Sequence, residues 1–264
     1  MKCYNNHTFA VCAYKESEHL ETCIKSLVNQ TSKSKIIIST STPNDYIYNI
    51  AKKYDIPVYN TNSKSDIQDD WNFAYNKADT DYVTVAHQDD IYRKEYLECV
   101  MEACNKYDDV SIAFTDYLPI KGDKVNGRDK NSKFRRLLRL PLKISPLANK
   151  RFVKRGCLAF GNSICCPSVT YHKKMLGDTI FTSELKFGLD WDTFEKIASM
   201  KGRFVYVDKP VMCYRVYEGA TTNEFIVNHK REKEDIYMFN KFWPEFITKF
   251  IMKFYVKAYD TYKE

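Results

Sequence analysis

Hydrophobic residues in the first half of the chain follow two alternating patterns, short apolar runs and runs with helical spacing. Phe9 to Ala13 is a continuous apolar run typical of a buried strand, whereas the apolar residues from Leu20 to Val28 fall on one helical face. The alternation continues with expected strands at 36–38, 57–59, 82–86 and 111–115, and expected helices at about 47–51, 71–78 and 94–106. This order predicts an α/β fold with a Rossmann-like, mainly parallel sheet and helices on both faces.

The second half of the chain is less regular. From 121 to 150 the pattern breaks into a polar, basic stretch with two prolines, which we expect to be a long excursion. Beyond it, the regular pattern predicts a strand at 168–171, a helix that begins at about Asp190, and a strand at 203–207. The tail after Asn223 has helical spacing. We therefore expect one domain over 1–225 and a C-terminal helical extension over 226–264.

Composition narrows the class of protein. Hydrophobic residues make up 44% of the 264 residues and charged residues 28%, so a sizeable core is available. The mean hydropathy of −0.51 and the absence of a long apolar run predict no membrane span, and the polar N-terminus predicts no signal peptide. Nine cysteines without C-x-x-C spacing favour reduced thiols over a zinc site or disulfides. These features predict a cytoplasmic protein.

The net charge of +7 has a local source. Nine Lys/Arg and no Asp/Glu lie between Lys133 and Arg155, and the rest of the chain has 41 − 9 = 32 basic against 34 acidic residues. A local basic stretch suits phosphates or an anionic membrane surface, which would place the protein peripherally on the inner face of the plasma membrane. A solvated basic loop is the alternative. The charge pattern does not predict a nucleic-acid partner.

Polar residues follow several predicted strands at the sheet edge where parallel sheets bind ligands. These strand ends are Tyr14 to Glu16, Ser39 to Thr42, His87 to Asp90, and Asp116. The chain has only eight glycines and no glycine-rich phosphate loop, so a dinucleotide site is not expected.

The strand end His87-Gln88-Asp89-Asp90 carries the strongest chemical signal. Adjacent carboxylates at a sheet edge offer hard oxygen ligands, and Mg²⁺ or Mn²⁺ is typically held by one or two carboxylates plus substrate phosphates. The alternative is a solvated turn in which Asp90 caps the next helix.

The order of these elements resembles that of the family 2 glycosyltransferases of the GT-A fold. Similarity extends from Thr8 to Thr222 and rests on several short motifs in the right order, none of which is decisive alone. The matching segments are Tyr14-Lys15-Glu16 with Asn29-Gln30-Thr31, Trp71-Asn72-Phe73-Ala74, Gln88-Asp89-Asp90, Pro167-Ser168-Val169, Leu189-Asp190-Trp191 and Tyr214-Arg215.

The resemblance implies an inverting transfer of a sugar from a nucleotide-diphosphate donor. Asp89 would ligate Mn²⁺ or Mg²⁺ at the donor diphosphate, with Asp90 as a further ligand, and Asp190 would be the general base that deprotonates the acceptor hydroxyl. Because Asp190 begins a helix, we expect the helix dipole to favour its charged form. Asp192 is the rival base but lies on another face of the helix. The implied donor-binding residues are Tyr14, Glu16, Thr40, Trp71, Asn72, Gln88 and Arg215.

The chain departs from the family pattern at four places. Ser39-Thr40 replaces an acidic pair that contacts base and ribose, and His87 replaces the first aspartate of the metal motif. Tyr217 replaces a histidine and Leu189 a glutamate. The resemblance implies a nucleotide-sugar donor, with a UDP-sugar favoured. However, the neutral Ser39-Thr40 pair predicts weaker discrimination for uridine.

The implied acceptor is a glycan or a lipid-linked glycan, as in bacterial surface polysaccharide synthesis. Nucleotidyl transfer on a related sheet and a non-catalytic glycan- or membrane-binding module are the alternatives. In the tail, Phe242, Phe246, Phe250 and Phe254 recur every four residues beside lysines. We expect this stripe to pack on its own domain rather than on a membrane.

Overall fold

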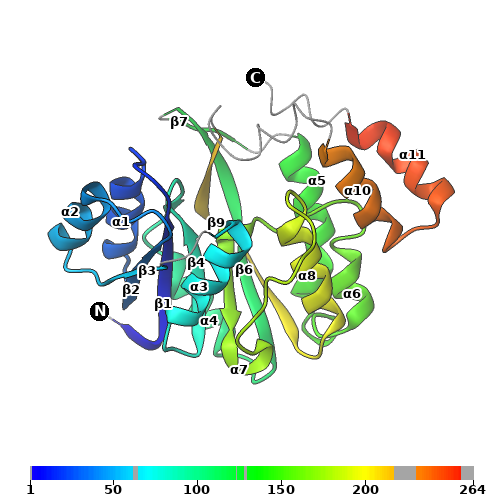
Figure 1. Ribbon diagram of the computed structural model, residues 1–264. Helices are drawn as coiled ribbons and strands as arrows, with labels where there is room; N and C mark the ends of the chain where they lie inside the picture. The colour runs from blue at the N-terminus through cyan, green and yellow to red at the C-terminus, as the bar shows by residue number, and fades with distance from the viewer. Residues whose placement is uncertain (1, 62–64, 123, 128–129, 217–229, 257–264) are drawn as a thin grey trace.

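The computed structural model describes residues 2–61, 65–122, 124–127, 130–216 and 230–256. It has one curved central sheet with helices on both faces (Figure 1). This confirms the α/β fold with a mainly parallel sheet and helices on both faces that the hydrophobic pattern predicted.

The nine strands combine a parallel half and a mixed half. Their order is β3-β2-β1-β4-β8-β6-β9-β5, with β7 paired to β6. Strands β3, β2, β1 and β4 are parallel, whereas β8 runs antiparallel between β4 and β6. The strands are β1 Cys3–Ala13, β2 Lys33–Thr40, β3 Val58–Asn60, β4 Tyr82–His87, β5 Ile91–Tyr92, β6 Val110–Lys121, β7 Lys124–Val125, β8 Val169–His172 and β9 Arg203–Val216.

Two hydrophobic clusters hold helices to opposite faces of the sheet. One cluster lies under α1, α2 and α4, and the other under α3, α6, α8, α10 and α11. In β1, Phe9 and Val11 enter the first cluster and Ala10 enters the second, as expected for a strand buried on both faces. The helices are α1 Leu20–Val28, α2 Asp45–Lys53, α3 Ile67–Lys77, α4 Tyr96–Cys104, α5 Lys130–Arg139, α6 Arg151–Gly156, α7 Lys173–Leu176, α8 Leu189–Ser199, α10 Lys230–Asn240 and α11 Glu245–Tyr255.

The basic stretch is more ordered than its sequence predicts. The expected excursion over 121–150 contains α5 and two short 3₁₀ turns, and α6 follows directly after it. Arg139 is fully buried and donates to Asp116 at 2.6 Å, and Lys154 is buried with its ammonium bound to two backbone carbonyls. Arg136 forms a bidentate pair with Asp208. Much of the local positive charge therefore stabilises the fold.

The tail is helical in its described part, and its boundary at residue 225 lies outside the described residues. Met238, Phe239 and Met252 belong to the same core cluster as α8. The expected packing of the phenylalanine stripe is wrong for three of its four members, because Phe246, Phe250 and Phe254 are 73%, 62% and 60% exposed. Among the described helices, none has the length and apolar character needed to cross a membrane.

Candidate active site

A cavity of about 240 Å³ lies beyond the carboxyl ends of the strands, where the sequence predicted a site. His87 and Asp89 reach it from the end of β4, and Trp71 reaches it from α3. Asp190 at the start of α8 lines it as well. The predicted metal ligand and the predicted general base therefore share one cavity.

Three potential metal ligands gather at the end of β4. Ligand atoms of His87, Asp89 and Asp90 all lie within 4.8 Å of one another. His87 stacks on Trp71 with ring centroids 4.9 Å apart, which fixes the plane of the imidazole. Burial lowers the pKa of His87, against the opposing charge of Asp89, and so favours the neutral form that can donate a lone pair.

The polar atoms of this cluster fit a divalent cation. His87 Nε2 and Asp90 Oδ2 are buried and have no hydrogen-bond partner among the described residues. Burial and the neighbouring Asp89 raise the pKa of Asp90 well above its usual range. Unpaired buried polar atoms are costly, and a bound cation would satisfy both at once.

Arg215 holds the Asp89-Asp90 turn from the neighbouring strand β9. Its backbone N–H donates to Asp90 Oδ1 at 2.9 Å, and its guanidinium donates to the backbone carbonyls of Asp89 and Gly122 at 2.9 and 3.0 Å. Residues alternate in a strand, so Tyr214 lines the cavity instead. The structure thus places Arg215 as a support of the Asp89-Asp90 turn.

Gln88 connects this turn to the end of β1. Its side chain accepts from the backbone N–H of Tyr14 at 2.9 Å and donates to the Tyr14 carbonyl at 3.1 Å. Tyr14 is 49% exposed and Glu16 is exposed, and neither lines the cavity. Both remain predicted donor contacts at the rim of the sheet edge.

Two further predicted donor contacts have partners within the protein. Thr40 is buried, and its hydroxyl accepts from the backbone N–H of Thr42 at 3.0 Å. Asn72 forms a two-bond clamp with the backbone of Phe181, at 2.7 and 3.1 Å, which fixes α3 against the segment before α8. Of the Trp71-Asn72 pair, only Trp71 lines the cavity.

Both carboxylate oxygens of Asp190 accept hydrogen bonds from uncharged donors. Its Oδ2 accepts from Asn162 Nδ2 at 2.7 Å, and its Oδ1 accepts from the backbone N–H of Trp191 at 2.8 Å. Burial raises the pKa of Asp190 to about 6, outweighing the lowering effects of the Trp191 N–H and of Arg135. The expected dominance of the helix dipole is therefore wrong: burial decides the direction of the shift.

The segment before Asp190 is fixed by the C-terminal helix α10. Glu234 accepts from the backbone N–H groups of Lys186, Phe187 and Gly188, at 3.0, 2.7 and 2.7 Å. A carboxylate at a helix start satisfies N–H groups that have no intrahelical partner. The tail of the chain therefore helps to position the candidate base.

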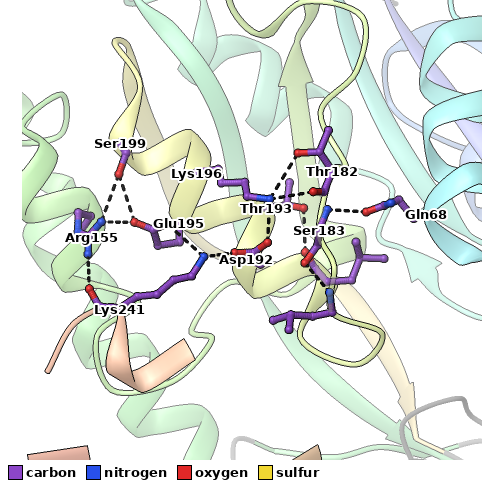
Figure 2. A network of polar contacts seen from close by, with 12 residues as sticks. Gln68, Arg155, Thr182, Ser183, Asp192, Thr193, Glu195, Lys196, Ser199 and Lys241 are labelled. Atoms are coloured by element: carbon purple, nitrogen blue, oxygen red, sulfur yellow. Dashed lines mark hydrogen bonds and ion pairs between the residues drawn. The ribbon is translucent and has the colours of Figure 1, made fainter. Parts of the chain in front are cut away.

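Asp192, two residues further on, belongs to an ion-pair network that also includes Glu195 and Lys196 of α8 (Figure 2). Its side chain is 4% exposed and pairs with Lys196 at 2.9 Å and with Lys241. Glu195 pairs with Arg155 in the same network. Although burial opposes it, hydrogen bonding from Lys241, Ser183 and Lys196 lowers the pKa of Asp192. Asp192 does not line the cavity, in agreement with its predicted exclusion as the base.

Sequence reasoning missed three residues of this arrangement. His87 was interpreted as a departure that leaves Asp89 as the main ligand, although a histidine two residues before a pair of aspartates is itself a metal-ligand signal. Asn162 and Glu234 lie 28 and 46 or more residues from the atoms that they bind. Their roles have no local signal in the sequence.

The sheet, the acidic turn after β4 and the carboxylate at the start of α8 match the arrangement that the resemblance to glycosyltransferases of the GT-A fold implied. The family model described as Glycosyl transferase family 2 matches residues 8–164, more than half of the chain. The chain therefore belongs to glycosyl transferase family 2. A comparison with curated proteins gave no match.

Solved structures with the same fold include nucleotide-sugar complexes. TarS 1–349 from S. aureus in complex with UDP-GlcNAc has a TM-score of 0.62 and 17% identity, over 96% of this chain and 70% of that one. A mannosyltransferase from Pyrobaculum calidifontis in complex with GDP-Man and Mn²⁺ has a TM-score of 0.64 and 14% identity, over 90% and 64%. Glucosyl-3-phosphoglycerate synthase from Mycobacterium tuberculosis with Mg²⁺ and UDP has a TM-score of 0.55 and 12% identity, over 86% and 79%.

Proposed function

We propose that this family 2 member is an inverting, metal-dependent glycosyltransferase that moves a sugar from a nucleotide-diphosphate donor to an acceptor hydroxyl. The observation that carries the proposal is the single cavity lined by His87 and Asp89 on one side and by Asp190 on another. Donor activation and acceptor deprotonation require groups of these two kinds around one reacting centre.

His87, Asp89 and Asp90 would hold the divalent cation. A bound cation would offset the negative charge that develops on the leaving diphosphate. The comparison structures are described with Mn²⁺ in one case and Mg²⁺ in another. The imidazole of His87 favours Mn²⁺ here, because Mg²⁺ prefers an all-oxygen environment and nitrogen ligands suit transition metals.

Asp190 is the proposed base. In its ionised form, Oδ2 or Oδ1 would take the proton of the acceptor hydroxyl while the hydroxyl oxygen attacks the anomeric carbon. The bond from that carbon to the diphosphate oxygen breaks in the same step, and the nucleoside diphosphate leaves. Asn162 holds one oxygen and the Trp191 N–H holds the other, so the carboxylate is oriented before the acceptor binds. A single displacement at the anomeric carbon, assisted by one base, inverts the configuration of that carbon.

The proposed donor is a nucleotide sugar, with UDP- and GDP-sugars as the first to test, since relatives of this fold are described in complex with both. The proposed acceptor is a glycan or a lipid-linked glycan, in bacterial surface polysaccharide synthesis. This part of the proposal rests on the family resemblance of the sequence.

Titration of the purified chain with nucleotide sugars and Mn²⁺ tests the proposal. We expect saturable donor binding that requires the cation, and slow release of free nucleoside diphosphate in the absence of acceptor. Asp89→Asn should weaken the Mn²⁺-dependent affinity for the nucleotide sugar by ~10–100-fold or more. Loss of a group that only supports a metal ligand already costs a metal site that much, and Asp89 is a proposed ligand itself. Unchanged affinity in Asp89→Asn would remove this residue from the metal site.

A further inference from the structure

A second cavity, of about 360 Å³, lies between α5 and α11 on the same side of the sheet as the active-site cavity. Its walls are mainly apolar. They are formed by Phe134, Phe160, Phe250, Ile251 and Phe254, with Asn131 and Gly161. A cavity of this size and character is typical of a small-ligand site.

The two cavities share part of their walls. Arg135, Arg231 and Tyr255 line both. Arg231 pairs with Asp235 at 3.5 Å, and Arg135 donates to the Tyr117 hydroxyl at 3.2 Å. Gly161, which lines the second cavity, directly precedes the Asn162 that holds Asp190. The apolar cavity thus adjoins the candidate base, with two guanidinium groups at the junction.

A nucleotide sugar carries hydroxyl and phosphate groups over most of its length, so the apolar cavity matches an alkyl chain better than it matches the donor. The predicted donor contacts Tyr14, Glu16 and Gln88 lie at the ends of β1 and β4, whereas the second cavity is built from α5 and α11. Its position beside Asp190 assigns it to the acceptor.

The phenylalanine side chains that line the cavity are exposed to solvent, which indicates that a ligand covers them. Phe134, Phe250 and Phe254 are 48%, 62% and 60% exposed. Clustered exposed aromatic side chains are unfavourable in water and mark a binding surface. Guanidinium groups at one end of such a surface complement an anionic group attached to an apolar chain.

We infer that this cavity binds the apolar chain of an amphiphilic acceptor, whose phosphate-containing linkage lies at Arg135 and Arg231 and whose hydroxyl reaches Asp190. The inference rests on the proposed function, since it assigns the acceptor class for the same site. The proposed occupant is a single lipid chain within the cavity. If the exposed phenylalanines instead contact a bilayer surface, variants inside and outside the cavity should lose apolar binding equally, and the inference would be wrong.

Alkyl phosphates of increasing length are suitable probes. Binding of octyl, decyl and dodecyl phosphate to the intact chain is measured by calorimetry below the micelle concentration, with inorganic phosphate and decyl maltoside as comparison ligands. We expect roughly tenfold tighter binding for each two methylenes added until the cavity is filled. We also expect decyl phosphate to bind more tightly than decyl maltoside. Equal affinity for these two ligands would overturn the anionic linkage, and no dependence on chain length would overturn the apolar cavity.

A pair of double variants separates the cavity from the general apolar surface. Phe250→Ala with Phe254→Ala removes two walls of the cavity, whereas Phe152→Ala with Phe246→Ala removes two phenylalanines of 72% and 73% exposure that do not line it. We expect the first pair to weaken decyl phosphate binding by at least roughly tenfold and the second to leave it within about twofold. Equal loss in both pairs, or loss in neither, would overturn the inference.

Donor binding in the same variants keeps this inference distinguishable from the proposed function. Mn²⁺-dependent nucleotide affinity should be unchanged in both double variants, because neither pair touches the metal cluster. If the intact chain binds nucleotide but no alkyl phosphate, the acceptor class is wrong and the transferase proposal stands. If it binds alkyl phosphate but no nucleotide, the transferase proposal fails.

Discussion

The turn after β4 and the first turn of α8 each contain two aspartates. Of these four side chains, Asp192 in α8 is the one that pairs with lysines in the described part of the chain. Asp89 and Asp90 form no ion pair with a lysine or arginine in the described part of the chain, and Asp90 has a raised pKa. At the start of α8, Asp190 also has a raised pKa, whereas Asp192 is paired with two lysines and has a lowered one.

This contrast separates function from scaffold. A buried carboxylate that is paired with lysines has already been neutralised by the fold, so it has little capacity left for a metal or a proton. A buried carboxylate without a cation is unfavourable in the free protein and gains most from a ligand. By this criterion Asp90 and Asp190 are candidate ligand-binding carboxylates, with the partly buried Asp89 next to Asp90, whereas Asp192 belongs to the framework.

The largest effect should come from Asp190→Asn. The amide keeps the shape but accepts no proton, so the transfer rate should fall by roughly 10²–10⁴-fold. Steady-state transfer to an acceptor, together with donor affinity by calorimetry, measures this. Asp192→Asn, assayed well below its unfolding temperature, is the matched control and should retain most of the rate. Equal losses in the two variants would break the distinction between them.

The pH dependence sharpens the same contrast. Because the base must be ionised and the pKa of Asp190 is about 6, kcat/KM should fall about tenfold per pH unit below pH 6 and level off above it. The raised pKa has the opposite effect on stability. The folded state holds its proton more tightly than the unfolded state, so ionisation of Asp190 costs stability as the pH rises through about 6.

The stability side of this prediction has its own measurement. Asp190→Asn should raise Tm at pH 8 relative to the unmodified chain, and the difference should shrink towards pH 4, where both side chains are neutral. Thermal unfolding at the two pH values measures it. A Tm difference that does not change with pH would argue against a raised pKa at this position.

Asp192→Asn should act on stability instead of on chemistry. Loss of the charge leaves Lys241 and Lys196 without their main anionic partner, and we expect a loss of about 1–3 kcal/mol in the free energy of unfolding. Since the pKa of Asp192 is lowered, its contribution should be present at neutral pH and decline as the pH falls. Urea unfolding measures the change. Lys196→Met, which removes the more exposed of the two lysines, should cost less, about 0–1 kcal/mol.

The sequence predicted the regular half of the molecule well, for a physical reason. Strands buried on both faces are continuous apolar runs, and their polar ends mark the ligand-binding edge. The antiparallel strand β8 was predicted as a strand, but its place between β4 and β6 has no local signature. The register and full length of β9, which extends to Val216, depend in the same way on pairing with β6.

The candidate site was predicted only where its residues are adjacent in sequence. The His87 to Asp90 run is visible as a local pattern, and the Asp190-Trp191 pair matches a short motif of the family that the sequence resembles. The supports of Asp190, namely Asn162 and Glu234, come from other segments through tertiary packing. The burial that raises the pKa of Asp190 is also a tertiary effect, which explains why a local helix-dipole argument gave the wrong direction.

The smallest expected effect concerns the nucleotide. Ser39 and Thr40 at the end of β2 are both buried, and the Thr40 hydroxyl already accepts a bond from the Thr42 N–H. Neutral hydroxyls with internal partners make fewer charge-assisted bonds to a base or ribose than two carboxylates. We therefore expect UDP and GDP to differ in affinity by less than about tenfold, or about 1.4 kcal/mol, in the presence of Mn²⁺. Competition calorimetry with both nucleotides measures the ratio. Ser39→Asp, which restores one acidic residue at this strand end, should shift the ratio, and a strong preference for one nucleotide in the unmodified chain would show that another residue reads the base.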